Sequence, residues 1–231
     1  LLPLSQAWRL PIYCYGKCKS LSLRGRIILN TPIQSGLIKI GYASDAFSWD
    51  TRVLINIKGN WIVNGPFSAS RGVTLEVVGT LETDEGVGLG ARVKIRCWNS
   101  IKLGKYVRLA EECQLFDTNF HFIQDVLTRE VSTIYGTINI GDYSWIGNRT
   151  SIMKGTVLPR RTIVASNSLV SKDYSAISVE YPLLGGTPAK FISSGKARIF
   201  NLDLEYKLFN IFYSNKELIK YHLQPDENDF L

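Results

Sequence analysis

The chain has 231 residues and only two histidines, His121 and His222, and the first lies in an unusual stretch. Residues 116–122 read Phe-Asp-Thr-Asn-Phe-His-Phe, which places Asp117 and Asn119 four and two residues before His121. An imidazole titrates near neutral pH, so it can take the proton of a hydroxyl group while that oxygen forms a bond. On an extended segment, even spacing points all three polar side chains to one side. The pattern predicts a general base at His121, whereas His222 has no such surroundings.

A six-residue repeat is the clearest regular feature around this stretch. Every sixth residue from position 140 to position 170 is aliphatic, and Ser or Thr follows each of the first five by four residues. The aliphatic positions are Ile140, Ile146, Ile152, Leu158, Val164 and Val170, and the small ones are Ser144, Thr150, Thr156, Thr162 and Ser168. We interpret each hexad as a short strand with a turn, and three hexads as one triangular coil with its aliphatic side chains inside. Because one coil cannot bury its apolar face alone, the coils must stack.

The repeat predicts an all-β fold, a left-handed parallel β-helix (a hexapeptide-repeat solenoid), with a short C-terminal helical segment. Left-handed crossovers break the usual right-handed rule for parallel strands, and the hexapeptide pattern is specific to that exception. The alternative is an antiparallel β-sandwich, whose strands alternate every two residues and impose no six-residue spacing.

The extent of the repeat predicts three segments. Looser hexads begin earlier in the chain, which places the β-helix at residues 37–182. Residues 1–36 show no repeat and are predicted to form a basic N-terminal cap, because six Lys and Arg residues and no acidic residue precede Asp45. Residues 183–231 are predicted to form a turn and one or two short amphipathic helices.

The six-residue spacing is interrupted near His121. From Leu115 to Ile140 there are 25 residues, where one coil of three hexads needs about 18. The surplus must leave the prism, so we expect a catalytic loop at about residues 116–139. Loops held by a rigid scaffold often carry function.

Four ordered motifs resemble those of the hexapeptide-repeat sugar O-acetyltransferases. They are Asp-x-Asn-x-His at 117–121, the coil with a Trp at 140–147, the coil at 164–173, and Gly-Thr-Pro-Ala-Lys at 186–190. The residues of these motifs are most similar to those of the capsule, exopolysaccharide and O-antigen acetyltransferases. This resemblance implies direct transfer of an acetyl group from acetyl-CoA to a hydroxyl of a cell-surface polysaccharide or its sugar precursor, with His121 as the base.

The resemblance also implies roles for individual residues. Asp117, Asn119 and Trp145 are expected to bind the acceptor, and Asp117 could instead orient His121. The residues expected to bind acetyl-CoA are Gly147, Asn148, Ser166, Ser171, Lys172 and Lys190. The backbone N–H of Gly147 is a candidate donor to the oxyanion that forms on the thioester. The family forms homotrimers with each site between two chains, and we expect the same here.

Other functions stay open at this point. An N-acetyltransferase acting on a nucleotide-linked amino sugar is a second enzyme hypothesis, and a non-catalytic β-helix binding module is a third. We expect no metal, since the four cysteines form no CxxC motif and a histidine-ligated site would need more than two histidines. The net charge is +7, but aromatic residues do not alternate with basic ones as in single-strand nucleic-acid binders, so we expect no nucleic acid.

The sequence also bears on localisation. No run of about 18 apolar residues indicates a membrane span, and Leu1 to Leu10 do not resemble a signal peptide. We expect reduced cysteines and a cytoplasmic protein. The basic N-terminal stretch could lie on an anionic membrane, at its inner face, or could form a solvated cap over the first coil.

Overall fold

The structure is a computed structural model that describes residues 2–42 and 51–224. It divides into two compact units, Leu1–Lys196 and Ala197–Leu231. The first unit contains a short helix, α1 (Leu4–Ala7), and all the named strands, and the second contains helix α2 (Leu202–Ser214). No helix in the described parts of the chain is both long enough and apolar enough to cross a bilayer.

The strands of the first unit form three sheets. Sheet A has the order β1-β4-β7-β10-β13-β16-β19-β21-β22, sheet B the order β2-β5-β8-β11-β14-β17-β20, and sheet C the order β18-β15-β12-β9-β6-β3. The bounds are β1 (Ile12–Cys14), β2 (Cys18–Leu23), β3 (Arg26–Leu29), β4 (Ile38–Tyr42), β5 (Val53–Ile57), β6 (Asn60–Val63), β7 (Phe67–Ser70), β8 (Thr74–Val77), β9 (Thr80–Thr83), β10 (Val87–Leu89), β11 (Lys94–Cys97), β12 (Ser100–Leu103), β13 (Arg108–Leu109), β14 (Gln114–Phe116), β15 (Thr137–Ile140), β16 (Trp145–Ile146), β17 (Ser151–Met153), β18 (Thr156–Leu158), β19 (Ile163–Val164), β20 (Leu169–Val170), β21 (Leu183–Gly185) and β22 (Lys190–Ser193).

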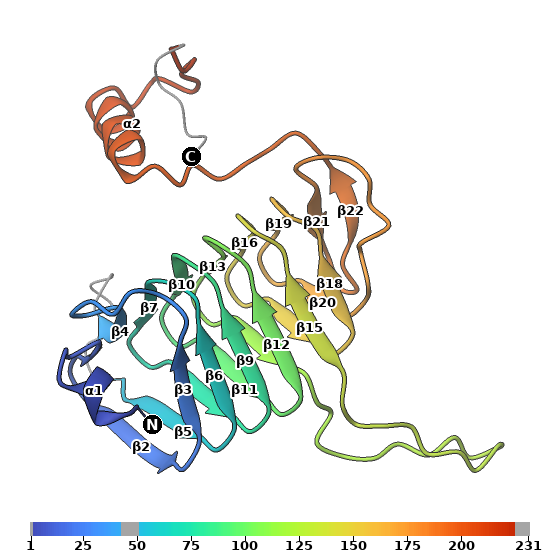
Figure 1. The fold of residues 1–231 in the computed structure, drawn as a ribbon. Helices are drawn as coiled ribbons and strands as arrows, with labels where there is room; N and C mark the ends of the chain where they lie inside the picture. Colours follow the sequence, from blue (N-terminus) through green and yellow to red (C-terminus); the bar gives the residue numbers. More distant parts are fainter. Residues whose placement is uncertain (1, 43–50, 225–231) are drawn as a thin grey trace. The chain divides into compact units, whose positions relative to one another are not determined.

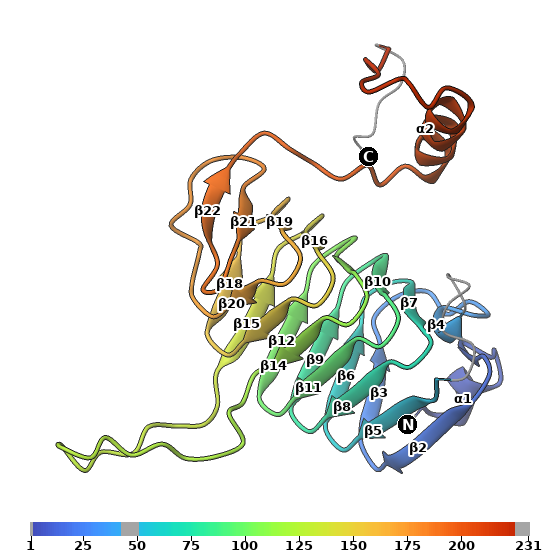
Figure 2. The same ribbon diagram turned by 180° about the vertical axis from the view of Figure 1, so that it is seen from behind.

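The order of the strands shows that the chain winds as a coil. From β1 to β17, each strand pairs in parallel with the strand three places later in the sequence. The coils therefore stack along one axis, with sheet C toward the viewer in Figure 1 and sheet B in Figure 2. The parallel β-helix with a short C-terminal helix that the repeat predicts is confirmed.

The repeat positions explain how the prism is filled. Ile140, Ile146, Ile152 and Leu158 are buried and belong to one continuous hydrophobic core. The small hydroxyl residues are buried as well, and each satisfies its hydroxyl locally. The side chains of Ser144, Thr156, Thr162 and Ser168 each donate to the carbonyl three residues earlier, at 2.7 Å. A hydroxyl residue can therefore occupy the buried small position without leaving a polar group unpaired.

The coils extend beyond the boundaries expected from the spacing. Strands β1, β2 and β3 pair in parallel with β4, β5 and β6, so the first coil begins at Ile12 and not near residue 37. The β2–β5 register shifts between Ser20 and Ser22, which hides the six-residue spacing in this segment. At the other end, β21 and β22 extend sheet A to Ser193, beyond residue 182, and β22 is antiparallel.

The interrupted hexad forms a hairpin. Strands β14 and β15 keep the register of their neighbours on both sides, so the inserted residues 117–136 leave the prism without disturbing its stack. Antiparallel bridges join Thr118 to Tyr135 and Gln124 to Val131 along the insertion. It projects from the prism between sheets B and C (Figure 1, yellow-green).

Candidate active site

The neck of the hairpin is fixed by Asp117. Its side chain is buried, and its two carboxylate oxygens accept from the backbone N–H groups of Trp98 and Asn99, each at 2.8 Å. Burial raises the pKa of Asp117, while these hydrogen bonds act in the opposite direction. Its carbonyl oxygen accepts from the N–H of Gly136, which closes the neck. Asp117 therefore anchors the hairpin to the preceding coil. Its side chain does not face solvent, so it is not placed to bind an acceptor as the sequence led us to expect.

Asn119 and His121 lie together in a pocket beyond this neck. The pocket has a volume of about 440 Å³. It is lined by Asn119, His121, Ile123, Gln124, Asp125, Ser132, Thr133 and Lys154. His121 is exposed, and Phe120 beside it has a φ of 61°, which breaks the extended course of the segment. Asp117 does not line this pocket, because its side chain is buried in the neck of the hairpin.

Lys154 joins the pocket from the next coil, and the sequence had not indicated it. Its Nζ donates to the carbonyl oxygen of Thr133 at 2.7 Å, which connects the returning arm of the hairpin to the prism. The corner at Lys154 follows β17, in register with the corner where the hairpin leaves β14. Its position one coil beyond the insertion is a signal that could have identified it.

An aromatic cluster supports Phe120 under the pocket. The Phe120 ring packs edge-on against Trp98 and Phe116, with centroids 5.4 and 6.0 Å away. The guanidinium of Arg96 lies 5.6 Å from the Phe120 ring centroid and 5.9 Å from that of Phe116. Because Phe120 lies between Asn119 and His121 in the chain, this cluster and Asp117 together position both polar residues.

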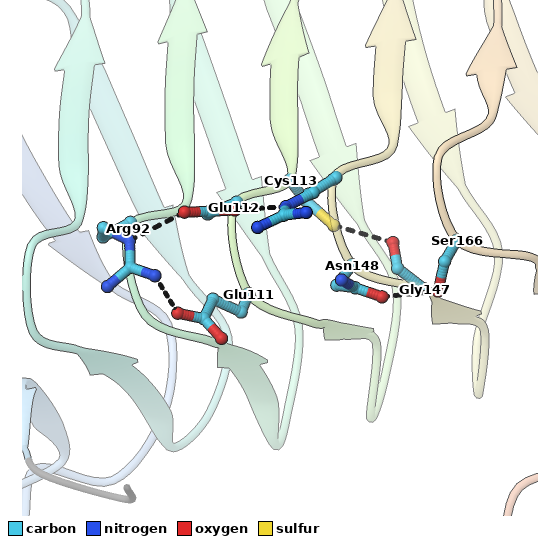
Figure 3. A network of polar contacts seen from close by, with 8 residues as sticks. Arg92, Glu111, Glu112, Cys113, Gly147, Asn148 and Ser166 are labelled. Atoms are coloured by element: carbon cyan, nitrogen blue, oxygen red, sulfur yellow. Dashed lines mark hydrogen bonds and ion pairs between the residues drawn. The ribbon is translucent and has the colours of Figure 1, made fainter. Parts of the chain in front are cut away.

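Three of the residues expected to bind acetyl-CoA lie at a different corner, between sheets A and B. Gly147 and Asn148 lie on one coil and Ser166 on the next (Figure 3), and the Ser166 hydroxyl donates to Asn148 Oδ1. The N–H of Gly147 donates to the carbonyl of Val164 at 2.8 Å, so it is not available to an oxyanion as the sequence had suggested. A Cβ at this position would lie 2.6 Å from the backbone nitrogen of Ser166, which explains the glycine.

Cys113 contacts the same corner but is not a nucleophile. Its thiol is buried and donates to the carbonyl oxygen of Gly147 at 3.1 Å. Burial raises the pKa of Cys113 to about 11, so the reactive thiolate is scarce at neutral pH. We conclude that Cys113 packs the core, in agreement with its place at a small position of the repeat.

An ion-pair ladder runs along this corner beside Asn148. Arg92 pairs with Glu111 and Glu112, and Arg149 of the next coil donates to Glu112 at 2.6 Å (Figure 3). These side chains are partly exposed, so each pair contributes little to stability. The ladder connects three successive coils and orders the corner.

The remaining expected residues lie elsewhere on the prism. Ser171 and Lys172 follow β20, at the corner from which the hairpin leaves, and the N–H of Val157 donates to the Lys172 carbonyl at 3.3 Å. Trp145 lies on β16 and Lys190 on β22, both in sheet A, and both side chains are exposed. One chain therefore brings Asn119 and His121 together, but of the residues expected to bind acetyl-CoA it places only Ser171 and Lys172 at the same corner of the prism. Asn148 and Lys154, which mark the two corners, are six residues apart in the sequence, so they lie at most about 20 Å from each other in space.

Similarity to characterised proteins is distant. The sequence matches no protein-family model. The probable acetyltransferase Rv3034c of Mycobacterium tuberculosis is 25% identical over 164 residues, which are 70% of this chain and 51% of that protein. The chain thus spans about half the length of this relative.

Solved structures of similar fold include three acyltransferases. The polysialic acid O-acetyltransferase OatWY has a TM-score of 0.46 and 18% identity, covering 87% of this chain and 98% of that one. The polySia-specific acetyltransferase NeuO has a TM-score of 0.43 and 16% identity, covering 92% of this chain and 94% of that one. A third structure is AntD, an N-acyltransferase from Bacillus cereus in complex with dTDP and 3-hydroxybutyryl-CoA. It has a TM-score of 0.42 and 13% identity, covering 90% of this chain and 95% of that one. At these identities and TM-scores, we carry none of their activities over to this chain.

Proposed function

We propose that this chain transfers an acetyl group from acetyl-CoA to a hydroxyl of a cell-surface polysaccharide or its sugar precursor, with His121 as general base. The observation that carries the proposal is the pocket on the hairpin, where an accessible imidazole lies beside the amide of Asn119 and the ammonium of Lys154. The motif resemblance at residues 117–121 and the mycobacterial relative named as a probable acetyltransferase support it.

The chemistry needs one base and no covalent intermediate on the protein. His121 takes the hydroxyl proton as the sugar oxygen attacks the thioester carbonyl carbon. The tetrahedral oxyanion then collapses, the carbon–sulfur bond breaks, and the coenzyme thiolate leaves and receives a proton. The raised pKa of Cys113 supports direct transfer, because the thiol at the acetyl-CoA corner stays protonated. Asn119 would hydrogen-bond the acceptor, and Lys154 would hold the rim of its pocket.

The separation of the site residues supports a second proposal, that the active site forms between chains of a homotrimer. His121 and Lys172 belong to one corner, whereas Asn148 and Ser166 belong to another. The hairpin also exposes large apolar side chains, including Val126 and the 94% exposed Leu127. A neighbouring chain would cover them and would bring its own acetyl-CoA corner to the pocket.

The test is an acetyl-transfer assay with matched histidine variants. The purified chain is incubated with acetyl-CoA and an oligosaccharide acceptor, and free coenzyme thiol is measured. His121→Ala should lower kcat by about 100- to 10,000-fold, the usual range for removing a general base. His222→Ala, in the C-terminal unit, should leave the rate unchanged.

Three results would contradict the proposal. Equal rates for His121→Ala and the unaltered chain would remove His121 from the mechanism. Products that resist mild base would be amides, since acetyl esters are cleaved, and would favour the N-acetyltransferase hypothesis. If no acceptor released coenzyme A and the alanine variant bound ligands normally, the chain would be a binding module.

A further inference from the structure

Among the residues that the structure describes, nothing closes the N-terminal end of the prism. Residues 2–29, here called the terminal coil, comprise α1 and strands β1, β2 and β3, which are the end strands of the three sheets. In the described part of the chain, nothing pairs with the outer edges of these strands. Helix α1 has four residues, none of them buried, so it covers the end only in part. Open strand edges are usually covered in native proteins, because they recruit other surfaces.

The terminal coil is rich in exposed apolar side chains. Trp8 is 67% exposed, Leu10 61%, and Leu4, Leu21 and Leu23 also face solvent. Two grooves of about 410 and 440 Å³ lie beside α1. The first is lined by Leu2, Ala7, Leu10, Pro11, Ile12 and Leu23, without a charged residue. An apolar surface of this kind marks an interaction site.

The charge of this end selects the kind of partner. Six cationic side chains precede the first acidic residue, Asp45, and all six are exposed. They are Arg9, Lys17, Lys19, Arg24, Arg26 and Lys39. A second copy of the same end would be repelled by this charge, whereas an anionic surface would be attracted.

We propose that the terminal coil docks on an anionic lipid bilayer, with Trp8 and Leu10 at headgroup depth and the surrounding cations over the lipid phosphates. Trp is favoured at the membrane interface, where its ring is half apolar and half polar. Cations near an anionic bilayer each add to binding, and apolar side chains add the contact that charge alone lacks. The guanidinium of Arg9 lies 5.5 Å from the Trp8 ring centroid, which places both elements of this surface side by side.

Docking at this end would set the height of the pocket above the membrane. Strand β14, from which the hairpin leaves, is the fifth strand of sheet B, four steps from β2. At about 4.8 Å for each step, the pocket lies roughly 20 Å along the axis from the docked end. If the proposed function holds, this height suits a glycan of several sugars carried on a lipid at the inner face of the membrane. The docking itself does not depend on that function.

The test is co-sedimentation of the full chain with vesicles. Vesicles of phosphatidylcholine alone are compared with vesicles that contain one third phosphatidylglycerol, at low and high salt. The chain should bind the anionic vesicles, and high salt should weaken that binding. The double variant Lys19→Gln and Arg24→Gln should bind about 25-fold more weakly, at about fivefold for each cation. Trp8→Ser should weaken binding at both salt concentrations.

Matched controls decide between this surface and others. Lys105→Gln removes an exposed cation from a central coil, and Tyr206→Ala removes an exposed ring from α2. Both should bind like the unaltered chain, and all variants should keep its thermal unfolding and its acetyl transfer to a soluble acceptor. The proposal is overturned if the unaltered chain does not bind anionic vesicles, or if Tyr206→Ala loses binding while the Trp8 variant keeps it.

Discussion

Replacing Asp117 with alanine should loosen the hairpin that carries His121. The carboxylate accepts from the N–H groups of Trp98 and Asn99 at 2.8 Å, and its side chain is buried. Alanine leaves both donors without a partner in a place that water does not reach. The neck would then have to open so that water could satisfy them, and the segment leading to His121 would move with it.

The loss of stability in Asp117→Ala follows from the two backbone donors that lose their acceptor. A buried donor left without its acceptor costs about 1–3 kcal/mol, so two would cost about 2–6 kcal/mol. We expect a loss of about 3 kcal/mol within this range, because the opened neck lets water satisfy the two donors in part. For a chain of this size, that loss corresponds to a decrease in Tm of about 6–12 °C. Asp117→Asn keeps one acceptor and should lose about half as much.

The measurement is thermal unfolding followed by circular dichroism, with acetyl transfer assayed in parallel. Asp125 provides the control, because it also accepts from two backbone N–H groups, those of Leu127 and Thr128, but at the exposed tip of the hairpin. Asp125→Ala should lower the free energy of unfolding by less than about 1 kcal/mol, since water replaces the carboxylate. Equal losses for the two variants would refute the role given to burial at Asp117.

Three further predictions concern pH, packing and assembly. Because burial raises the pKa of Asp117 in the folded chain, proton binding to this carboxylate stabilises the fold at low pH, and that stabilisation is lost as the pH rises through the folded value. The unaltered chain should therefore gain stability relative to Asp117→Asn on acidification below neutral pH, and a constant difference would contradict this. Gly147→Ala should destabilise by about 1–3 kcal/mol in urea unfolding, because its Cβ meets the backbone of Ser166, and an unchanged midpoint would exclude this contact. Mixed and refolded His121→Ala and Ser166→Trp chains should recover activity that neither has alone, whereas a site within one chain predicts no recovery.

The fold could be predicted where each strand repeats the same local constraint. The residues from Ile140 to Val170 carry an inward aliphatic side chain and a hydroxyl every six positions, and both are buried as expected. The first coil escaped prediction because its terminal position removes one neighbour. Residues of β2 such as Leu21 and Leu23 are exposed, and the register of β2 shifts at Ser20. A terminal coil is under weaker constraint to keep the spacing.

The site could be predicted only in part, because sequence spacing does not show which polar side chain is buried. Sequence spacing grouped Asp117, Asn119 and His121, and the structure brings the last two together in one pocket. The carboxylate of Asp117 instead accepts from two backbone N–H groups in the buried neck, and no pattern of residue types indicates that contact. Lys154 was missed for a different reason, since it joins the pocket through stacking across 33 residues of sequence.

The position of His121 implies that activity depends on assembly. A general base must lie within hydrogen-bond reach of the proton that it removes. Beyond the neck, residues 121–133 are all exposed, and the Lys154 contact with Thr133 is one of the few bonds from the prism to this part of the hairpin. An exposed hairpin with so few contacts cannot hold the imidazole of His121 in place to within a fraction of an ångström against thermal motion. A neighbouring chain packed on Val126 and Leu127 would supply the missing surface, so specific activity should fall on dilution below the concentration at which the chains dissociate.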